Sequence, residues 1–131
     1  IISGNGSILK QGTGEEVFTN ANQYQGGTTI QEGTLSLSSP SGSLYDQGAV
    51  IVGTGSTITS AIFDISGGSN QIIGDLTGTE KGEIILGNNQ FTFGSNNSSP
   101  QTFGGVISGS GSVVKKGTSE EIFTNANTYQ G

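Results

Sequence analysis

The sequence predicts an all-β protein, a parallel β-solenoid of about six coils with almost no α-helix. Glycine supplies 24 of the 131 residues and proline only 2, a combination typical of tight β-turns. Apolar residues make up 30% of the chain and charged residues 11%, which suits short strands around a thin core with neutral polar surfaces. No window has the apolar spacing of an amphipathic helix.

Strand-sized apolar runs recur along the chain, bounded by Gly, Ser or Asn, and several alternate with the period of two that a strand requires. In order, the expected strands are Ser7 to Lys10, Val17 to Thr19, Thr34 to Leu37, Val50 to Val52, Ile62 to Ile65 and Glu83 to Leu86. β-branched residues dominate these runs, which favours strands over helix.

A long internal repeat organises the chain. The segment ISGNGSILKQGTGEEVFTNANQYQG (Ile2 to Gly26) returns at an offset of 105 residues as ISGSGSVVKKGTSEEIFTNANTYQG (Ile107 to Gly131), and 18 of the 25 aligned pairs are identical. We therefore expect 1–131 to be one solenoid segment in which 2–106 is a repeat unit and 107–131 starts the next copy of a tandem array.

A shorter period lies inside the unit. It is marked by a nearly even succession of glycines, namely Gly27, Gly48, Gly68, Gly87 and Gly105. This spacing predicts five coils of about 21 residues per unit. It also predicts an inward-facing column three residues before successive glycines, formed by Tyr24, Tyr45, Ile65 and Ile84.

These residues carry a resemblance to a known family. The string GxGSxxKxGT followed by FTNANxYQGGTTIQEGTLSLS resembles the autotransporter-associated β-strand repeat of bacterial autotransporter passengers. The structural motif residues that match are Phe18, Asn20, Asn22, Tyr24, Gly26 and Gly27, and in the second copy Phe123, Asn125, Asn127 and Tyr129. The resemblance implies a right-handed β-helix that is exported to the bacterial outer surface.

Composition excludes several kinds of chemistry and partner. The chain has no Cys, His, Met or Trp, so it has no thiol nucleophile, no imidazole base and no imidazole metal ligand. Four Lys and no Arg stand against 10 acidic residues, which gives a net charge of −6. We therefore expect no nucleic-acid partner, no membrane insertion and no cofactor.

Two acidic features remain as candidate sites. Asp64 and Glu83 each lie four residues before a glycine of the short period, so they are expected to point outward on adjacent coils as a surface acidic pair, with no metal and no catalytic role assigned. Carboxylate pairs of this kind serve polysaccharide-acting β-helix enzymes, which is the alternative class together with a carbohydrate-binding module. The pairs Glu15-Glu16 and Glu120-Glu121 are expected to be solvated surface charges.

The function expected from these observations is structural and adhesive, not enzymatic. The chain is interpreted as a rigid stalk segment of a secreted or surface-displayed adhesin, since selection for reach multiplies near-identical units whereas an active site is needed once. The expected partners are a host or bacterial surface protein or glycan, neighbouring repeats of the same chain, and further copies in head-to-tail self-association.

Overall fold

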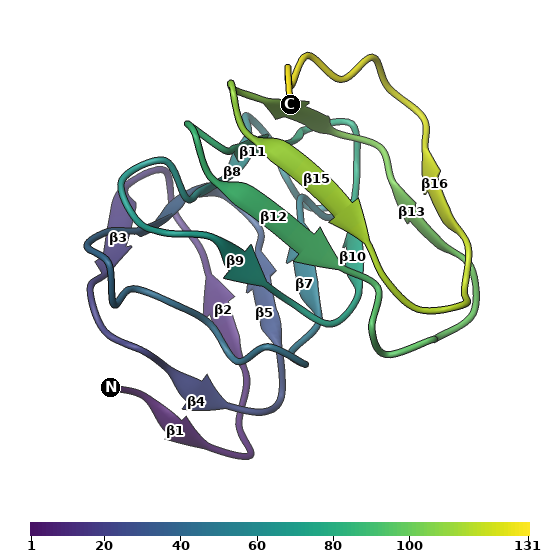
Figure 1. The fold of residues 1–131 in the computed structure, drawn as a ribbon. Helices are drawn as coiled ribbons and strands as arrows, with labels where there is room; N and C mark the ends of the chain where they lie inside the picture. Colours follow the sequence, from purple (N-terminus) through teal and green to yellow (C-terminus); the bar gives the residue numbers. More distant parts are fainter.

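The computed structural model describes all residues, Ile1–Gly131, and shows a parallel β-solenoid of about six turns (Figure 1). No element is a helix, and no segment forms a helix that could cross a membrane. All paired strands run parallel, so the predicted fold class is confirmed. The strands are β1 (Ser3–Gly4), β2 (Ile8–Lys10), β3 (Glu15–Phe18), β4 (Gln23–Tyr24), β5 (Thr28–Ile30), β6 (Gly33–Leu37), β7 (Val50–Val52), β8 (Ala61–Asp64), β9 (Gln71–Ile72), β10 (Leu76–Gly78), β11 (Gly82–Ile85), β12 (Gln90–Phe93), β13 (Gln101–Phe103), β14 (Val106–Ser108), β15 (Ser112–Lys115) and β16 (Glu121–Phe123).

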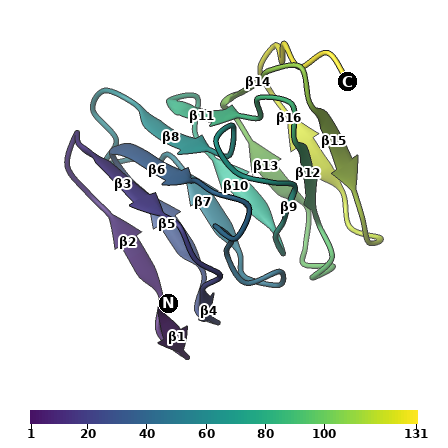
Figure 2. The ribbon, with the colours of Figure 1, turned by 60° about the vertical axis from the view of Figure 1, so that its left-hand side comes forward.

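The strands stack into three faces. Face 1 is the six-stranded sheet β16-β13-β10-β7-β5-β2, and face 2 is the five-stranded sheet β14-β11-β8-β6-β3. Face 3 consists of the pair β1-β4, a bridge from Ala21 to Ser43, and the three-stranded sheet β15-β12-β9. The chain passes the faces in the order 3, 1, 2, and Figure 2 shows the resulting stacks along the axis.

Period-two alternation along each strand builds the core. On face 2, Leu35, Phe63, Ile84 and Ile107 are directly opposite one another on successive strands, and all four are fully buried. Phenylalanines extend the core between the faces: Phe63 contacts Phe91 edge to face at 6.1 Å between ring centroids, and Phe91 lies 5.7 Å from Phe93. The six strands expected from the sequence are all present, within one or two residues of their expected bounds.

The predicted inward column is wrong, because its members lie on different faces. Tyr24 belongs to β4 on face 3 and Ile84 to β11 on face 2. Tyr24, Ile65 and Ile84 are buried, but Tyr45 is only half-buried. The glycines used to set the period occupy different corners of the solenoid. Gly48 packs on Gly27 before face 1, whereas Gly105 packs on Gly82 before face 2.

The expectation of five coils per 105-residue unit is also wrong. Face 3 is passed by β1, β4, the segment at Ser43, β9, β12 and β15, which makes five turns from β1 to β15. Ser3 lies on face 3, but its equivalent Ser108 lies in β14 on face 2, one face before β15. The repeat offset therefore equals four and two-thirds turns.

Loop length explains the difference. On face 2, Glu15 is opposite Thr34, whereas Gly33 is opposite Ala61. The second of these turns uses about half as much chain again as the first, although both rise by one strand spacing. Long segments at the corners lengthen some turns without disturbing the stacked strands, so a mean glycine spacing does not count turns.

Candidate functional site

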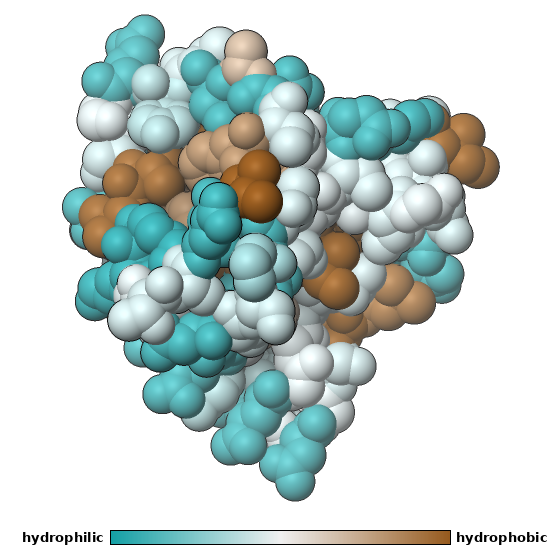
Figure 3. All heavy atoms as spheres, turned by 90° about the vertical axis from the view of Figure 1, so that its right-hand side faces the viewer, coloured by the Kyte–Doolittle hydropathy of each residue, from teal (hydrophilic) through white to brown (hydrophobic).

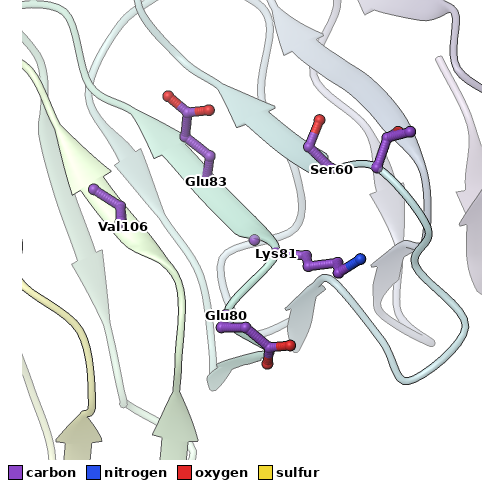
Figure 4. Close-up of a pocket in the computed structure, with 7 residues that line it drawn as sticks. Ser60, Glu80, Lys81, Glu83 and Val106 are labelled. Carbon is purple, nitrogen blue, oxygen red and sulfur yellow. The ribbon is translucent and has the colours of Figure 1, made fainter.

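A hollow of about 430 Å³ lies at the edge where face 1 meets face 2 (Figure 4). The loop before β8 forms one side, the loop before β11 forms another, and β14 contributes a single apolar side chain. Glu83 stands on β11 between Ser60 and Val106, whereas Glu80 and Lys81 project from the preceding loop. The lining residues are Thr59, Ser60, Glu80, Lys81, Gly82, Glu83 and Val106.

A carboxylate on the neighbouring turn holds the loop that lines this hollow. Glu32 accepts hydrogen bonds from the backbone N–H groups of Ile58 (2.9 Å) and Thr59 (2.8 Å) and from the Thr59 hydroxyl. The Thr59 hydroxyl contributes most, followed by the backbone donors, and together they lower the pKa of Glu32 to about 2. Its charge therefore persists at neutral pH and fixes the loop.

The lysine of the hollow is also committed to the fold. Lys81 donates a hydrogen bond from Nζ to the Ile58 carbonyl at 2.6 Å, so it ties the loop before β11 to the loop before β8. The remaining groups are two carboxylates, hydroxyls and a flat strand surface. Such a lining can hydrogen-bond the hydroxyl groups of a glycan or the polar groups of a peptide.

The structure places Asp64 and Glu83 on the outer side of face 2, on adjacent strands, but not directly opposite each other. Glu83 is opposite Ile62, and Asp64 is opposite Ile85, so the two acids are offset by two residues along the strands. Asp64 Oδ1 accepts a hydrogen bond from Ser66 N at 2.8 Å and thus caps its own turn. Only Glu83 lines the hollow. No three acidic side chains gather where they could hold a metal ion.

The asparagines of the repeat motif close one turn of the solenoid. Asn22 Oδ1 accepts from Ile2 N at 2.8 Å, and in the second copy Asn127 Oδ1 accepts from Ile107 N at 2.7 Å. The amide of Asn22 donates to the carbonyls of Asn20 and Ser43, which lie on its own turn and the next. These side chains replace strand hydrogen bonds at a corner where the backbone bends.

Other motif residues of the two copies pack into the interior of the solenoid at its two ends. Tyr24 is buried, and its hydroxyl lies 2.6 Å from Thr28 Oγ1; burial raises its pKa. Phe123 packs on Phe93 and Phe103, with ring centroids 6.0 and 6.3 Å away. A Cβ on Gly26 would lie only 2.7 Å from the Gly6 carbonyl oxygen, so glycine is needed there for the turns to approach.

The second glutamate of the later acidic pair does not face solvent as expected. Glu121 and Phe123 are two residues apart in β16, so both point inward, and Glu121 is half-buried with Oε1 lacking a hydrogen-bond partner. Burial raises the pKa of Glu121 to about 7, while Lys115 opposes the rise and Asp75 adds to it. The expectation of a solvated pair is therefore wrong for Glu121, whereas Glu15, Glu16 and Glu120 are exposed.

Sequence reasoning missed Glu32 and Glu121 for different reasons. The partners of Glu32 are 26 and 27 residues away, so no local pattern indicates them. Glu121 was detectable, because it precedes the motif phenylalanine by two residues and strand alternation places both on one side.

The comparisons with known proteins agree with the repeat found in the sequence. The passenger-associated transport repeat family matches residues 8–37 and 113–131. The chain is 33% identical to the adhesin BmaC autotransporter of Brucella suis biovar 1 (strain 1330), and the alignment includes 99% of the chain. The chain spans only 4% of the length of that relative. No solved structure matches the chain. The chain thus carries repeats of the autotransporter passenger type, and the resemblance found in its sequence is confirmed.

Proposed function

We propose that this chain is a rigid stalk segment of an autotransporter adhesin displayed on the bacterial outer surface. The observation that carries the proposal is the unbroken stacking of turns. Face 1 pairs strands on every turn from β2 to β16 with no interruption. A spacing of ~4.8 Å between paired strands makes this stack ~24 Å long.

Rigidity follows from how each turn is held. Strand pairing joins successive turns throughout faces 1 and 2 and, on face 3, within the pair β1-β4 and the sheet β15-β12-β9. One continuous cluster of 18 buried apolar residues runs through the interior. Bending the stack would open ladder hydrogen bonds on one face and expose core side chains, both of which cost free energy. Such a segment keeps its length and direction, and so it can hold a binding region away from the cell.

The adhesive part of the proposal rests on the relative and on the hollow beside Glu83. The relative is named an adhesin, and the polar hollow offers carboxylates and hydroxyls to a surface protein or glycan of a host or of a neighbouring bacterium. In this proposal the role is structural and not enzymatic. Near-identical turns repeated from unit to unit lengthen a stack, whereas an active site is needed only once.

Small-angle X-ray scattering on tandem chains of one, two and three repeat units tests the stalk. Each added unit should lengthen the particle by ~22 Å at constant cross-section, because four and two-thirds turns rise by ~4.8 Å each. A length that grows irregularly, or a cross-section that swells, would contradict a rigid stalk.

Binding is tested separately on a glycan array and on cells. The chain is compared with Glu83→Gln, which alters the hollow, and with Glu120→Gln as a matched exposed control away from it. Binding lost only in Glu83→Gln supports the hollow as the adhesive site. Equal signals from all three proteins assign adhesion to another part of the surface.

A further inference from the structure

We propose that successive repeat units present the repeat motif on different faces of the stalk, rotated by one third of a turn from unit to unit, so that a given side shows the motif only once in every three units. This inference rests on the proposed tandem stalk and adds its display geometry.

The motif forms the same closed turn in both copies. In the first copy, the backbone N–H groups of Gln23, Gln25 and Gly26 donate to the carbonyls of Ile2, Gly4 and Gly6 at 2.8, 2.9 and 3.0 Å. In the second copy, the equivalent donors Thr128, Gln130 and Gly131 reach Ile107, Gly109 and Gly111 at 2.9, 3.0 and 3.0 Å. Since Gly4 and Gly109 also share positive φ values of 111° and 122°, the local conformation is independent of position along the solenoid.

The two matching turns are nevertheless placed differently. β2 lies on face 1, but its copy β15 lies on face 3; β3 lies on face 2, but its copy β16 lies on face 1. Both changes are a shift by one face in the same direction, as is the shift of Ser3 on face 3 to Ser108 on face 2. Three strands of the motif therefore agree on a rotation of one third of a turn.

The rotation changes which surface residues align along the axis. Leu9 is 55% exposed on the outside of face 1, and the outward column above it contains Thr29, Ile51 and, on the last strand, Ile122. Ile122 is not the repeat equivalent of Leu9 but that of Val17, which points outward from face 2. Viewed from the end that carries β13 and β16, the hydrophobic residues form separate patches among hydrophilic residues (Figure 3).

This geometry selects the kind of partner that the motif turn fits. Three units contain fourteen turns, so motif turns recur on one side only every ~67 Å. A flat partner that touches one side cannot engage neighbouring units, and bivalent binding with a short linker gains nothing because the second site faces away. The outer surface of the motif therefore fits a partner that binds one motif turn at a time, whichever side of the stalk that turn faces.

Cysteine pairs in the chain test the placement directly, since it has no native Cys. Thr102→Cys with Ile122→Cys should oxidise to a disulfide, because these residues are directly opposite on face 1. Ser108→Cys with Ile122→Cys should not, because Ser108 lies in β14 on face 2 and Ile122 in β16 on face 1. Val17→Cys with Ser36→Cys, opposed on face 2, is the positive control. Cross-linking of the Ser108 pair, or of neither pair while the control cross-links, would overturn the proposal.

A chain of four tandem units extends the test to the array. Fab fragments raised against the motif turn are imaged on it by negative-stain electron microscopy. Successive Fabs should project in different directions, with the fourth aligned with the first. A single row of Fabs along one side would overturn the rotation while leaving the length gain of ~22 Å per unit intact, so failure of this inference is separable from failure of the stalk.

Discussion

Replacing Glu121 by Gln should make the stability of the solenoid less dependent on pH. Glu121 points into the core beside Phe123, and burial raises its pKa from 4.5 to about 7, with Lys115 opposing the rise and Asp75 adding to it. The folded chain thus binds this proton more tightly than the unfolded chain. Protonated Glu121 is compatible with its site at low pH, and the free energy of unfolding falls as pH rises from 4.5 to about 7.

The magnitude follows from the size of the pKa shift. A rise from 4.5 to about 7 corresponds to ~3.4 kcal/mol for a fully buried group, and screening of this half-buried carboxylate reduces the effect to about 1–2 kcal/mol. The loss is complete above a pH of about 7. Glu32 acts in a separate window: its pKa is lowered to about 2, so its stabilisation is present above its ordinary value of 4.5 and is lost as pH falls from there towards 2.

Urea unfolding followed by circular dichroism at about pH 5 and about pH 8 measures the effect. The wild-type chain should lose about 1–2 kcal/mol between these conditions, whereas Glu121→Gln should lose almost none. Glu120→Gln, an exposed neighbour in the same repeat, should behave like the wild type. If Glu121→Gln keeps the full pH dependence, the assignment of the inward carboxylate is wrong.

Four further outcomes are expected. Phe91→Ala should lower the free energy of unfolding by about 3–5 kcal/mol, because it empties a fully buried site between two aromatic rings, whereas Ile58→Ala, 79% exposed, should change it by less than ~0.5 kcal/mol in the same urea titration. Asn22→Ala leaves the Ile2 N–H and Ser43 carbonyl without this partner and should cost about 1–2 kcal/mol by thermal unfolding; an unchanged Tm would rule out its corner role. Millimolar Ca²⁺ should leave the Tm unchanged, and a rise that Glu83→Gln abolishes would reveal a metal site. The unpaired outer edges of β2 and β16 should promote head-to-tail association at high concentration, which a strict monomer in light scattering would contradict.

Much of the fold could be predicted because its signals are local. Strand alternation identified the runs around Thr34 to Leu37 and Ile62 to Ile65, and both are strands with buried inward residues. Glycine with little proline indicated tight corners, and the second copy of the opening segment indicated repetition. The roles of Asn22 and Tyr24 as motif residues were also visible, although their hydrogen-bond partners were not.

By itself, the sequence determined that this protein is a parallel β-solenoid with a long internal repeat, because alternation, β-branched content and self-similarity act over neighbouring residues or are read directly from the chain. Only the tertiary structure decided how many turns that repeat makes and which face each motif strand occupies. The physical reason is that stacking depends on which strands come to lie opposite each other after loops of unequal length, as the short step from Glu15 to Thr34 and the long step from Gly33 to Ala61 show on one face. No local sequence pattern shows how many residues each turn contains. The hydrogen-bond partners of Glu32 and the face on which each motif strand lies are therefore visible only in the folded chain.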